Sequence, residues 1–237
     1  MENVATIVAD HVQCVRQRIA RAAQRAGRSA DSVRLIAVTK YVEADVIRHI
    51  VAAGCHDLGE SRPQVLWKKH RELADLAVRW HLIGHLQTNK VRRTLKLARL
   101  ECVESADRVP LLESLQAEAS KLERSLDVLL EVRVSPDPTK HGFCRDELPS
   151  VIRRFHQWPA LRLRGLMTMA SLHADEEQTR REFQRLRVWR DELVAELGCD
   201  QSLRELSMGM SRDFEIAIEC GATIVRVGSA LVEGVVR

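Results

Sequence analysis

Two kinds of segment alternate along the chain. Short runs rich in branched apolar residues, such as "LIAV" at 35–38 and "DVLLEV" at 127–132, have the composition of strands. Longer segments between them place apolar residues three or four positions apart, as an amphipathic helix does. The runs that predict strands are 33–40, 55–60, 78–85, 100–105, 127–134, 161–170, 203–209 and 222–228.

The helical periodicity is clearest in four segments. They cover about 4–26, which precedes the first strand, and 107–122, 175–196 and 212–220. In each of the first three segments the apolar residues are expected to form one packed face. These faces consist of Val4, Ile7, Val8, Cys14, Val15 and Ile19, then Leu111, Leu115, Ala119 and Leu122, then Phe183, Leu186, Val188, Leu193 and Val194.

Strand–helix alternation predicts an α/β fold with parallel strands joined by right-handed crossovers. Eight such units can close into a (β/α)8 TIM barrel, whose usual length is about 250 residues. An open doubly wound sheet is the rival, but the first crossover, "AVTKYVEADVI", has no glycine and no G-x-G-x-x-G is present. We therefore expect one domain over 1–237, with an N-terminal helix in 1–30 and a barrel over 33–230.

Composition narrows the classes of function. Of the 237 residues 45% are hydrophobic, and 37 basic side chains barely exceed 33 acidic ones, for a net charge of +4. The sequence has no basic stretch with interspersed aromatic residues, so nothing in it predicts nucleic-acid binding. It also has no apolar run that approaches the ~18 residues needed to span a membrane. The six cysteines form no CxxC pair, and acids at positions 2 and 10 do not suit a signal peptide. A soluble cytoplasmic protein with reduced thiols is expected.

The loops after the seventh and eighth strands have the composition of a phosphate site. Barrels of this class frequently bind phosphate there. Hydroxyl groups come from Ser207 and Ser211, and Gly209 lets the backbone come close to a ligand. Ser211 is also a candidate N-cap for the helix 212–220. Gly228 and Ser229 add a second small, polar turn. A plain strand-to-helix turn is the alternative interpretation.

Lys40 ends the first apolar strand, "LIAVTK", and is expected to point into the barrel mouth. Burial disfavours a charged amine and so increases its neutral, nucleophilic fraction, as Schiff-base chemistry requires. A reactive amine on one side of the mouth and a phosphate-binding loop on the other would suit pyridoxal 5′-phosphate (PLP), which has an aldehyde at one end and a phosphate at the other. The alternative is an ordinary polar residue at the end of a strand.

Arg226 alternates with Val225 and Val227 in "TIVRVGS", so it points to the face opposite theirs. If that face is the barrel interior, the guanidinium needs a partner. A pyridine ring nitrogen is one candidate acceptor, and an arginine there would leave the nitrogen unprotonated and the cofactor a weak electron sink. A salt bridge to an interior carboxylate is the competing explanation.

The histidines of "HLIGH" raise the question of a metal site. His81 and His85 are four residues apart, which on a strand separates them by roughly 13 Å. We therefore expect no metal site from this pair. His81 is expected in the core, and whether His85 lines the mouth and touches a cofactor is left open.

Several motifs together carry a resemblance to a known family. "LIAVTK", "LGESRPQ", "WHLIGHLQTNKVR", "KHG", "RGLMTMA" and "LSMGMSRDFEIAIECGATIVRVGSA" resemble the pyridoxal phosphate homeostasis protein family from near 33 to 230. The resemblance implies a barrel similar to the N-terminal domain of alanine racemase, with PLP held as an aldimine by Lys40. It also implies a pyridine-nitrogen contact from Arg226 and phosphate contacts from Ser211, Gly228 and Ser229, with Ser207, Met208 and Gly209 nearby.

Three positions depart from the family pattern. Thr39 stands where the family has Ser, and Ser229 where it has Thr, so both keep a hydroxyl. Ser61 replaces an Asn and is shorter, which leaves open whether it contacts the cofactor.

Racemase barrels are completed by a second domain that supplies an opposing base, and this sequence is expected to lack it. We therefore expect a monomeric PLP-binding protein with a role in vitamin B6 homeostasis, no catalytic residues and no robust catalysis. PLP-dependent apoenzymes are candidate recipients of the cofactor. The alternatives are a PLP-dependent amino-acid racemase or decarboxylase, and a phosphosugar-binding barrel without PLP.

Overall fold

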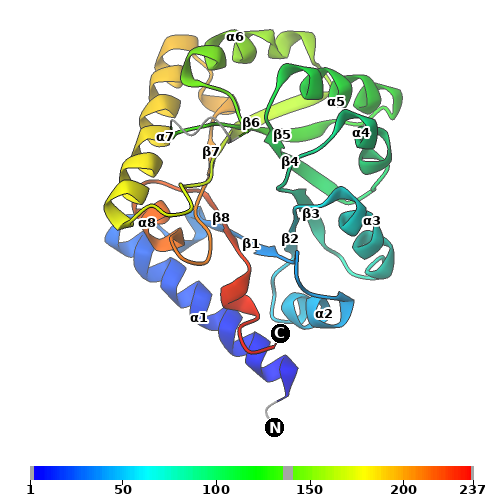
Figure 1. The fold of residues 1–237 in the computed structure, drawn as a ribbon, viewed down its shortest axis with the longest axis vertical. Helices are drawn as coiled ribbons and strands as arrows, with labels where there is room; N and C mark the ends of the chain where they lie inside the picture. The colour runs from blue at the N-terminus through cyan, green and yellow to red at the C-terminus, as the bar shows by residue number, and fades with distance from the viewer. Residues whose placement is uncertain (1–2, 136–140, 236–237) are drawn as a thin grey trace.

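Eight parallel strands close into a barrel in the computed structural model, which describes residues 3–135 and 141–235 (Figure 1). Each strand pairs with the next along the chain, and β8 closes the ring against β1. The predicted (β/α)8 fold is confirmed.

Lys140 of the "KHG" run lies outside the described residues. The strands are β1 (Arg34–Val38), β2 (Asp57–Glu60), β3 (Arg79–Leu82), β4 (Leu100–Ala106), β5 (Leu126–Glu131), β6 (Leu161–Met167), β7 (Glu205–Ser207) and β8 (Ile224–Val227).

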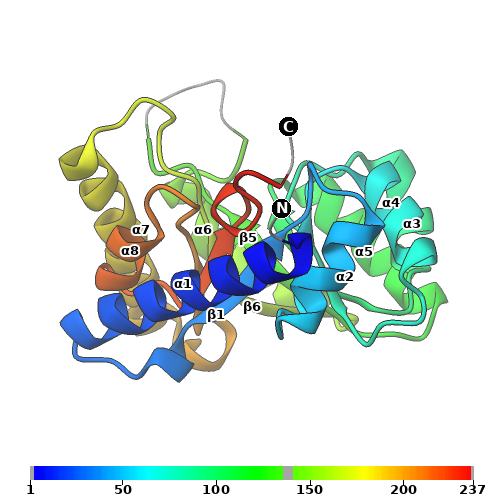
Figure 2. The ribbon, with the colours of Figure 1, turned by 90° about the horizontal axis from the view of Figure 1, so that it is seen from below.

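Helices surround the barrel on its outside (Figure 1). The predicted helix before the first strand is α1, and Figure 2 shows it lying across the barrel beside α2. None of the helices in the described ranges is long and apolar enough to cross a membrane. The helices are α1 (Val4–Arg25), α2 (Ala44–Ala52), α3 (Pro63–Glu72), α4 (Thr88–Leu95), α5 (Val109–Lys121), α6 (Leu148–Arg153), α7 (Glu176–Leu197) and α8 (Phe214–Glu219).

The buried face of α1 follows helical spacing more strictly than expected. Val8, Val12, Val15 and Ile19 recur at intervals of four, three and four, and all are buried. Cys14 falls between two of these positions and is exposed. The structure corrects three other predicted core residues, because two of them lie at helix ends and the third, in the middle of α7, points away from the buried Phe183 and Leu186. Exposed against expectation are Val4, Leu122 and Val188.

The barrel interior holds apolar and polar residues together. Ile36, Cys102, Leu129, Met167 and Ile224 form a buried apolar cluster separate from the main core between strands and helices. Alternation along a strand puts Arg226 on the same face as Ile224. The interior is therefore charged as well as apolar, and each buried charge needs a partner.

Candidate functional site

The carboxyl ends of β1, β7 and β8 bring the predicted site residues together. β1 pairs with β8 in a register that sets Ala37 beside Val227, so the residues after each strand leave the sheet side by side. Neighbouring strands lie about 4.7–4.9 Å apart. Lys40 and the loop at Gly228 are thus on adjacent strands, not on opposite sides of the mouth as expected. Closure of the ring makes the first and last strands neighbours, which brings the amine and the loops closer than predicted.

The backbone before Lys40 is fixed by a buried ion pair. Lys69 Nζ from α3 donates to Glu60 Oε2 at 2.7 Å and to the carbonyl oxygen of Thr39 at 2.6 Å. The two charged side chains are only 3% and 0% exposed. The Thr39 N–H also donates to the Gly59 carbonyl at 2.9 Å. These contacts hold the chain rigid one residue before Lys40. Sequence reasoning missed Lys69, whose one signal is a lysine on the buried face of a helix.

Lys40 itself is half-buried at the mouth. Its Nζ lies 4.8 Å from the centroid of the Tyr41 ring, within the range of a cation–π contact. The Tyr41 side chain is 73% exposed. The amine of the half-buried Lys40 therefore lies beside an aromatic ring that is itself open to solvent.

The loops after β7 and β8 meet through Ser211. Its Oγ accepts hydrogen bonds from the backbone N–H of Gly228 at 3.1 Å and of Ala230 at 3.4 Å. Gly209 has a φ of +93°, which favours glycine, and its carbonyl accepts from the Arg226 N–H at 3.0 Å. Two N–H groups that converge on one oxygen atom form the start of an anion cradle.

The helix after this loop begins later than predicted. It starts at Phe214, so Ser211 is not its N-cap. Asp213 Oδ1 instead accepts from the Met210 N–H at 2.5 Å and closes a turn before the helix. The Ser211 hydroxyl is consequently directed across to the neighbouring loop.

Two other predicted residues take different positions. Met208 is fully buried in the hydrophobic core, and its N–H donates to the Ile224 carbonyl at 3.1 Å. Its role in the described part of the chain is packing and pairing of the short strand β7. Ser229 is exposed at the start of a 3-10 turn, Ser229–Leu231, directly after Gly228.

Arg226 lies inside the barrel as predicted, with 3% exposure. Its Nη1 donates to Ser207 Oγ at 2.5 Å and its Nη2 to the Thr168 carbonyl at 2.8 Å. Burial lowers the pKa of Arg226, while the negative charges of Glu104, Glu131 and Asp213 favour its protonated form. The competing interpretation was a salt bridge to an interior carboxylate. Arg226 does reach such a carboxylate, Glu104, but through the hydroxyl of Ser207 that lies between them.

A chain of buried polar side chains leads from Arg226 through the barrel interior. Ser207 Oγ donates to Glu104 Oε2 at 2.6 Å, and Glu104 Oε1 lies 2.9 Å from His81 Nδ1. His81 Nε2 lies 3.2 Å from Asp57 Oδ1 at the start of β2. We call Asp57, His81, Glu104, Ser207 and Arg226 the interior network. Sequence reasoning placed His81 in the core, which is confirmed, but did not find its acidic partners.

Charges alternate along the interior network. Burial opposes a charged His81, but hydrogen bonds to Asp57 and Glu104 outweigh it and raise the pKa of His81 to about 9. Burial likewise opposes the ionised forms of Glu104 and Asp57. Hydrogen bonding to His81 nevertheless holds the pKa of Glu104 below its ordinary value, and hydrogen bonds to Arg79 and His81 do the same for the pKa of Asp57. A cationic imidazole between two carboxylates thus compensates the buried charge.

We expect Ser207→Ala to lower the free energy of unfolding by about 1–3 kcal/mol, because it leaves Glu104 and Arg226 without their bridging hydroxyl. Chemical denaturation measures the change. Ser229→Ala, which removes an exposed hydroxyl, is the control and should stay within about 0.5 kcal/mol. Equal effects of the two substitutions would show that the bridge contributes nothing.

Glu131, the last residue of β5, places a buried carboxyl group at the carboxyl end of the barrel. Burial raises the pKa of Glu131 to about 7, and the negative charge of Asp107 adds to the rise while Arg226 opposes it. Glu131 is therefore about half protonated at neutral pH. A buried carboxyl that titrates near neutrality can act as an acid or a base.

His81 and His85 take separate partners, as the strand spacing predicts. His81 belongs to the interior network, whereas His85 Nδ1 lies 2.9 Å from Asp107 Oδ2 at the mouth. The His85 side chain is 38% exposed.

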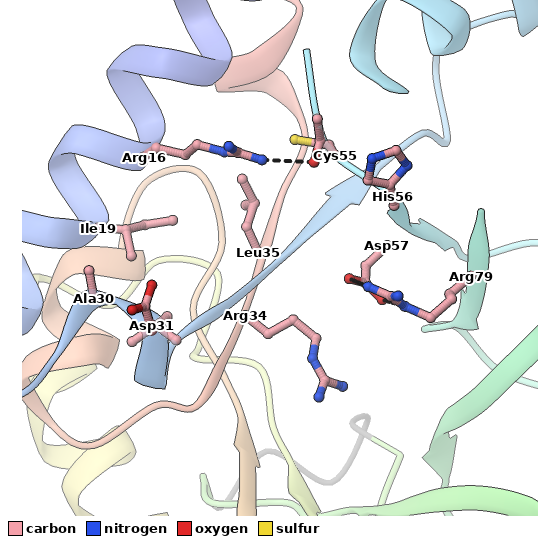
Figure 3. Close-up of a pocket in the computed structure, with 12 residues that line it drawn as sticks. Arg16, Ile19, Ala30, Asp31, Arg34, Leu35, Cys55, His56, Asp57 and Arg79 are labelled. Atoms are coloured by element: carbon pink, nitrogen blue, oxygen red, sulfur yellow. Dashed lines mark hydrogen bonds and ion pairs between the residues drawn. The ribbon is translucent and has the colours of Figure 1, made fainter. Parts of the chain in front are cut away.

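A hollow of about 390 Å³ lies at the opposite, amino-terminal end of the strands (Figure 3). Its wall includes Arg34, Asp57 and Arg79, which begin β1, β2 and β3. Arg79 donates to both Asp57 oxygens at 2.7 and 2.6 Å, and Arg16 donates to the Gly54 carbonyl at 2.8 Å (Figure 3). These arginines are engaged with the protein itself. The amino-terminal face of such a barrel serves stability, so the candidate site is at the other end.

Comparison with known proteins identifies the fold and the family. The family described as alanine racemase, N-terminal domain, matches residues 11–234. The alanine racemase of Corynebacterium glutamicum has the same fold, with a TM-score of 0.69 at 16% identity, over 96% of this chain and 61% of the racemase.

Closer relatives have the length of this chain. The pyridoxal phosphate homeostasis protein of Aquifex aeolicus is 40% identical over 217 residues, covering 92% of this chain and 93% of the relative. PipY of Synechococcus elongatus, whose structure was solved with PLP bound, is 34% identical with a TM-score of 0.84, over 94% of this chain and 99% of that one.

Proposed function

The chain belongs to the pyridoxal phosphate homeostasis protein family, and from this premise we propose that it binds PLP at the barrel mouth through a Schiff base to Lys40. The observation that carries the proposal is the adjacency of two features on β1 and β8. An accessible amine follows one strand, and the converging N–H groups of Gly228 and Ala230 follow its neighbour.

The donors at the mouth fit the chemistry of PLP. When bound, PLP supplies an aldehyde that condenses with an amine and a ring that draws electrons from it. Lys40 supplies the amine. The cradle of Ser211, Gly228 and Ser229, supported by Ser207, Met208 and Gly209, supplies hydroxyl and N–H donors for the phosphate. Arg226, whose guanidinium lies in the barrel interior, would be the residue that meets the ring nitrogen.

The interior network supports this role of Arg226. Two of its nitrogens are already engaged, with Ser207 and with the Thr168 carbonyl, so the guanidinium plane is fixed before any ligand arrives. An arginine does not transfer its proton to a pyridine nitrogen. The ring then remains a weak electron sink, which suits storage and transfer of PLP better than carbanion chemistry. We propose a carrier of PLP in vitamin B6 homeostasis that lacks robust catalysis.

One observation favours a second candidate, a PLP-dependent racemase or decarboxylase. Glu131 has a pKa of about 7 and could supply the acid/base group that such an enzyme requires. Turnover of an amino acid at about 1–10³ s⁻¹ by the PLP-loaded protein, lost in Glu131→Gln, would support the enzyme and contradict the carrier.

Titration of the cofactor-free protein with PLP, pyridoxal and inorganic phosphate tests the proposal. A covalent PLP site binds PLP more tightly than pyridoxal, because pyridoxal lacks the phosphate. A phosphosugar barrel would instead bind phosphate without any change in the absorbance of added PLP.

We expect Ser211→Ala to weaken PLP binding about tenfold or more, since a hydrogen bond to a charged group contributes about 1.5–3 kcal/mol. The affinity for pyridoxal should change little. Equal losses for both ligands would place Ser211 outside the phosphate contacts. Absorbance titration of both ligands gives the two affinities, and Ser125→Ala, at an exposed serine directly before β5, serves as the control.

A further inference from the structure

Three side chains gather at the mouth in the sector away from Lys40. His85 follows β3, Asp107 follows β4 and His141 follows β5, and β5 is opposite β1 in the eight-stranded ring. One candidate ligand atom from each lies within 4.8 Å of the others. Among the described residues this is the one group of at least three His, Cys, Asp or Glu side chains close enough to share an ion.

The backbone on either side of the cluster is held in place. Ser105 Oγ donates to the Gly84 carbonyl at 2.7 Å, directly before His85. On the other side, the Phe143 N–H donates to the Glu131 carbonyl at 2.8 Å, and Phe143 is bridged to Val132. Gly142 has a φ of +113°, and a Cβ there would lie 2.8 Å from the Glu131 carbonyl oxygen. The glycine lets the chain approach β5 closely and sets the position of His141.

Both imidazoles face the same oxygen of Asp107. His85 Nδ1 lies 2.9 Å and His141 Nδ1 3.8 Å from Asp107 Oδ2. The two rings stack with centroids 4.5 Å apart and an interplanar angle of 28°. A hydrogen bond explains the first distance but not the second, which is too long for one.

The separations suit an ion placed between the three atoms. Zinc binds imidazole nitrogen at about 2.0–2.1 Å with tetrahedral geometry, which sets neighbouring ligand atoms about 3.4 Å apart. The observed 2.9 and 3.8 Å fall on either side of that spacing. Arg108 Nη1 holds Asp107 Oδ1, which orients the carboxylate and leaves Oδ2 directed at the histidines.

We propose that His85, Asp107 and His141 bind one divalent transition-metal ion. Two imidazoles and a carboxylate suit Zn²⁺, Co²⁺ or Ni²⁺, whereas Mg²⁺ and Ca²⁺ take oxygen ligands. The Asp107 side chain is 2% exposed, and the histidines are 38% and 64% exposed. The buried carboxylate anchors the ion, and the open side leaves coordination positions for water.

This proposal revises the sequence-based expectation of no metal. That expectation concerned one pair in a single predicted strand, His81 and His85, whereas the cluster contains one residue from each of three segments that follow different strands. The signal in the sequence is weak, because Asp107 directly follows β4 and His85 comes soon after β3, whereas His141 comes only ten residues after the end of β5. The metal proposal does not depend on the proposed binding of PLP.

Isothermal titration of the metal-free, untagged protein with Zn²⁺ tests the proposal in the absence of PLP. We expect one ion per chain, and His141→Ala should weaken binding by at least about tenfold. His141 is exposed, so this substitution should leave the fold intact. The matched control is His173→Ala, which removes an exposed histidine from the loop after β6 and should bind zinc as the wild type does.

Cobalt provides a second measurement, because Co²⁺ spectra distinguish nitrogen and oxygen ligands from thiolate. A tetrahedral spectrum without a thiolate band, lost in His85→Ala/His141→Ala, supports the site. A thiolate band would assign the metal to a cysteine such as the exposed Cys14 and overturn the proposal. Equal zinc affinity of the wild type and the double variant would overturn it as well.

Discussion

Lys40→Ala should lose covalently attached PLP altogether, and its affinity for the cofactor should fall at least about 100-fold, equivalent to about 2.8 kcal/mol. The reason is that the substitution removes the amine but leaves the cradle of Ser211 and Gly228 intact. Residual binding then depends on the proposed contacts to the phosphate and to the ring nitrogen. Absorbance and fluorescence titrations with PLP measure the loss.

The control for this prediction is Lys121→Ala. Lys121 lies at the end of α5 with its side chain 68% exposed and pairs with Glu118. Its loss should leave PLP binding unchanged. If both variants bound PLP as the wild type does, Lys40 would have no part in the site.

His81→Leu should lower the free energy of unfolding by about 3–5 kcal/mol, the cost of removing one partner from a buried charge pair. Glu104 would remain at 0% exposure, without the imidazole that compensates its charge. Denaturant unfolding monitored by circular dichroism measures the effect. His173→Leu, at an exposed position, should change the stability by no more than about 0.5 kcal/mol.

The contribution of His81 to stability depends on pH in a defined direction. The pKa rises from 6.5 in the unfolded chain to about 9 in the folded protein. The stabilisation is therefore fully present below pH 6.5 and is lost as the pH rises through about 9. The difference in stability between wild type and His81→Leu should shrink over that interval. A difference that stayed constant would show that His81 is not charged in the folded protein.

The fold followed from the sequence because its signals are local. Eight apolar runs, separated by helical periodicity and without a glycine-rich first crossover, leave few architectures other than the closed barrel. Lys40 and Arg226 could also be singled out, since a charged residue within or at the end of an apolar strand is conspicuous. Ser211 lies in the loop after β7 and its phosphate contact stays a prediction, whereas its predicted role as a helix cap is wrong because α8 begins only at Phe214.

The residues that hold the site residues in place could not be predicted, because their roles depend on contacts between strands and helices that are far apart in the sequence. Glu104 and Ser207 are separated by 103 positions yet share a hydrogen bond. Lys69 shares the buried face of α3 with Leu66, but its partner Glu60 is known only once the helix is packed on the barrel. The cluster of His85, Asp107 and His141 requires three strand ends to be neighbours, which only the closed barrel specifies.

The central claim is that PLP attaches to Lys40 beside the loops after β7 and β8. Borohydride reduction of the PLP-loaded wild-type protein, followed by proteolysis and mass spectrometry, tests it directly. We predict a single pyridoxyl group on the peptide that contains Lys40. A group on another lysine, such as Lys69, or a modification spread over surface lysines would contradict the account.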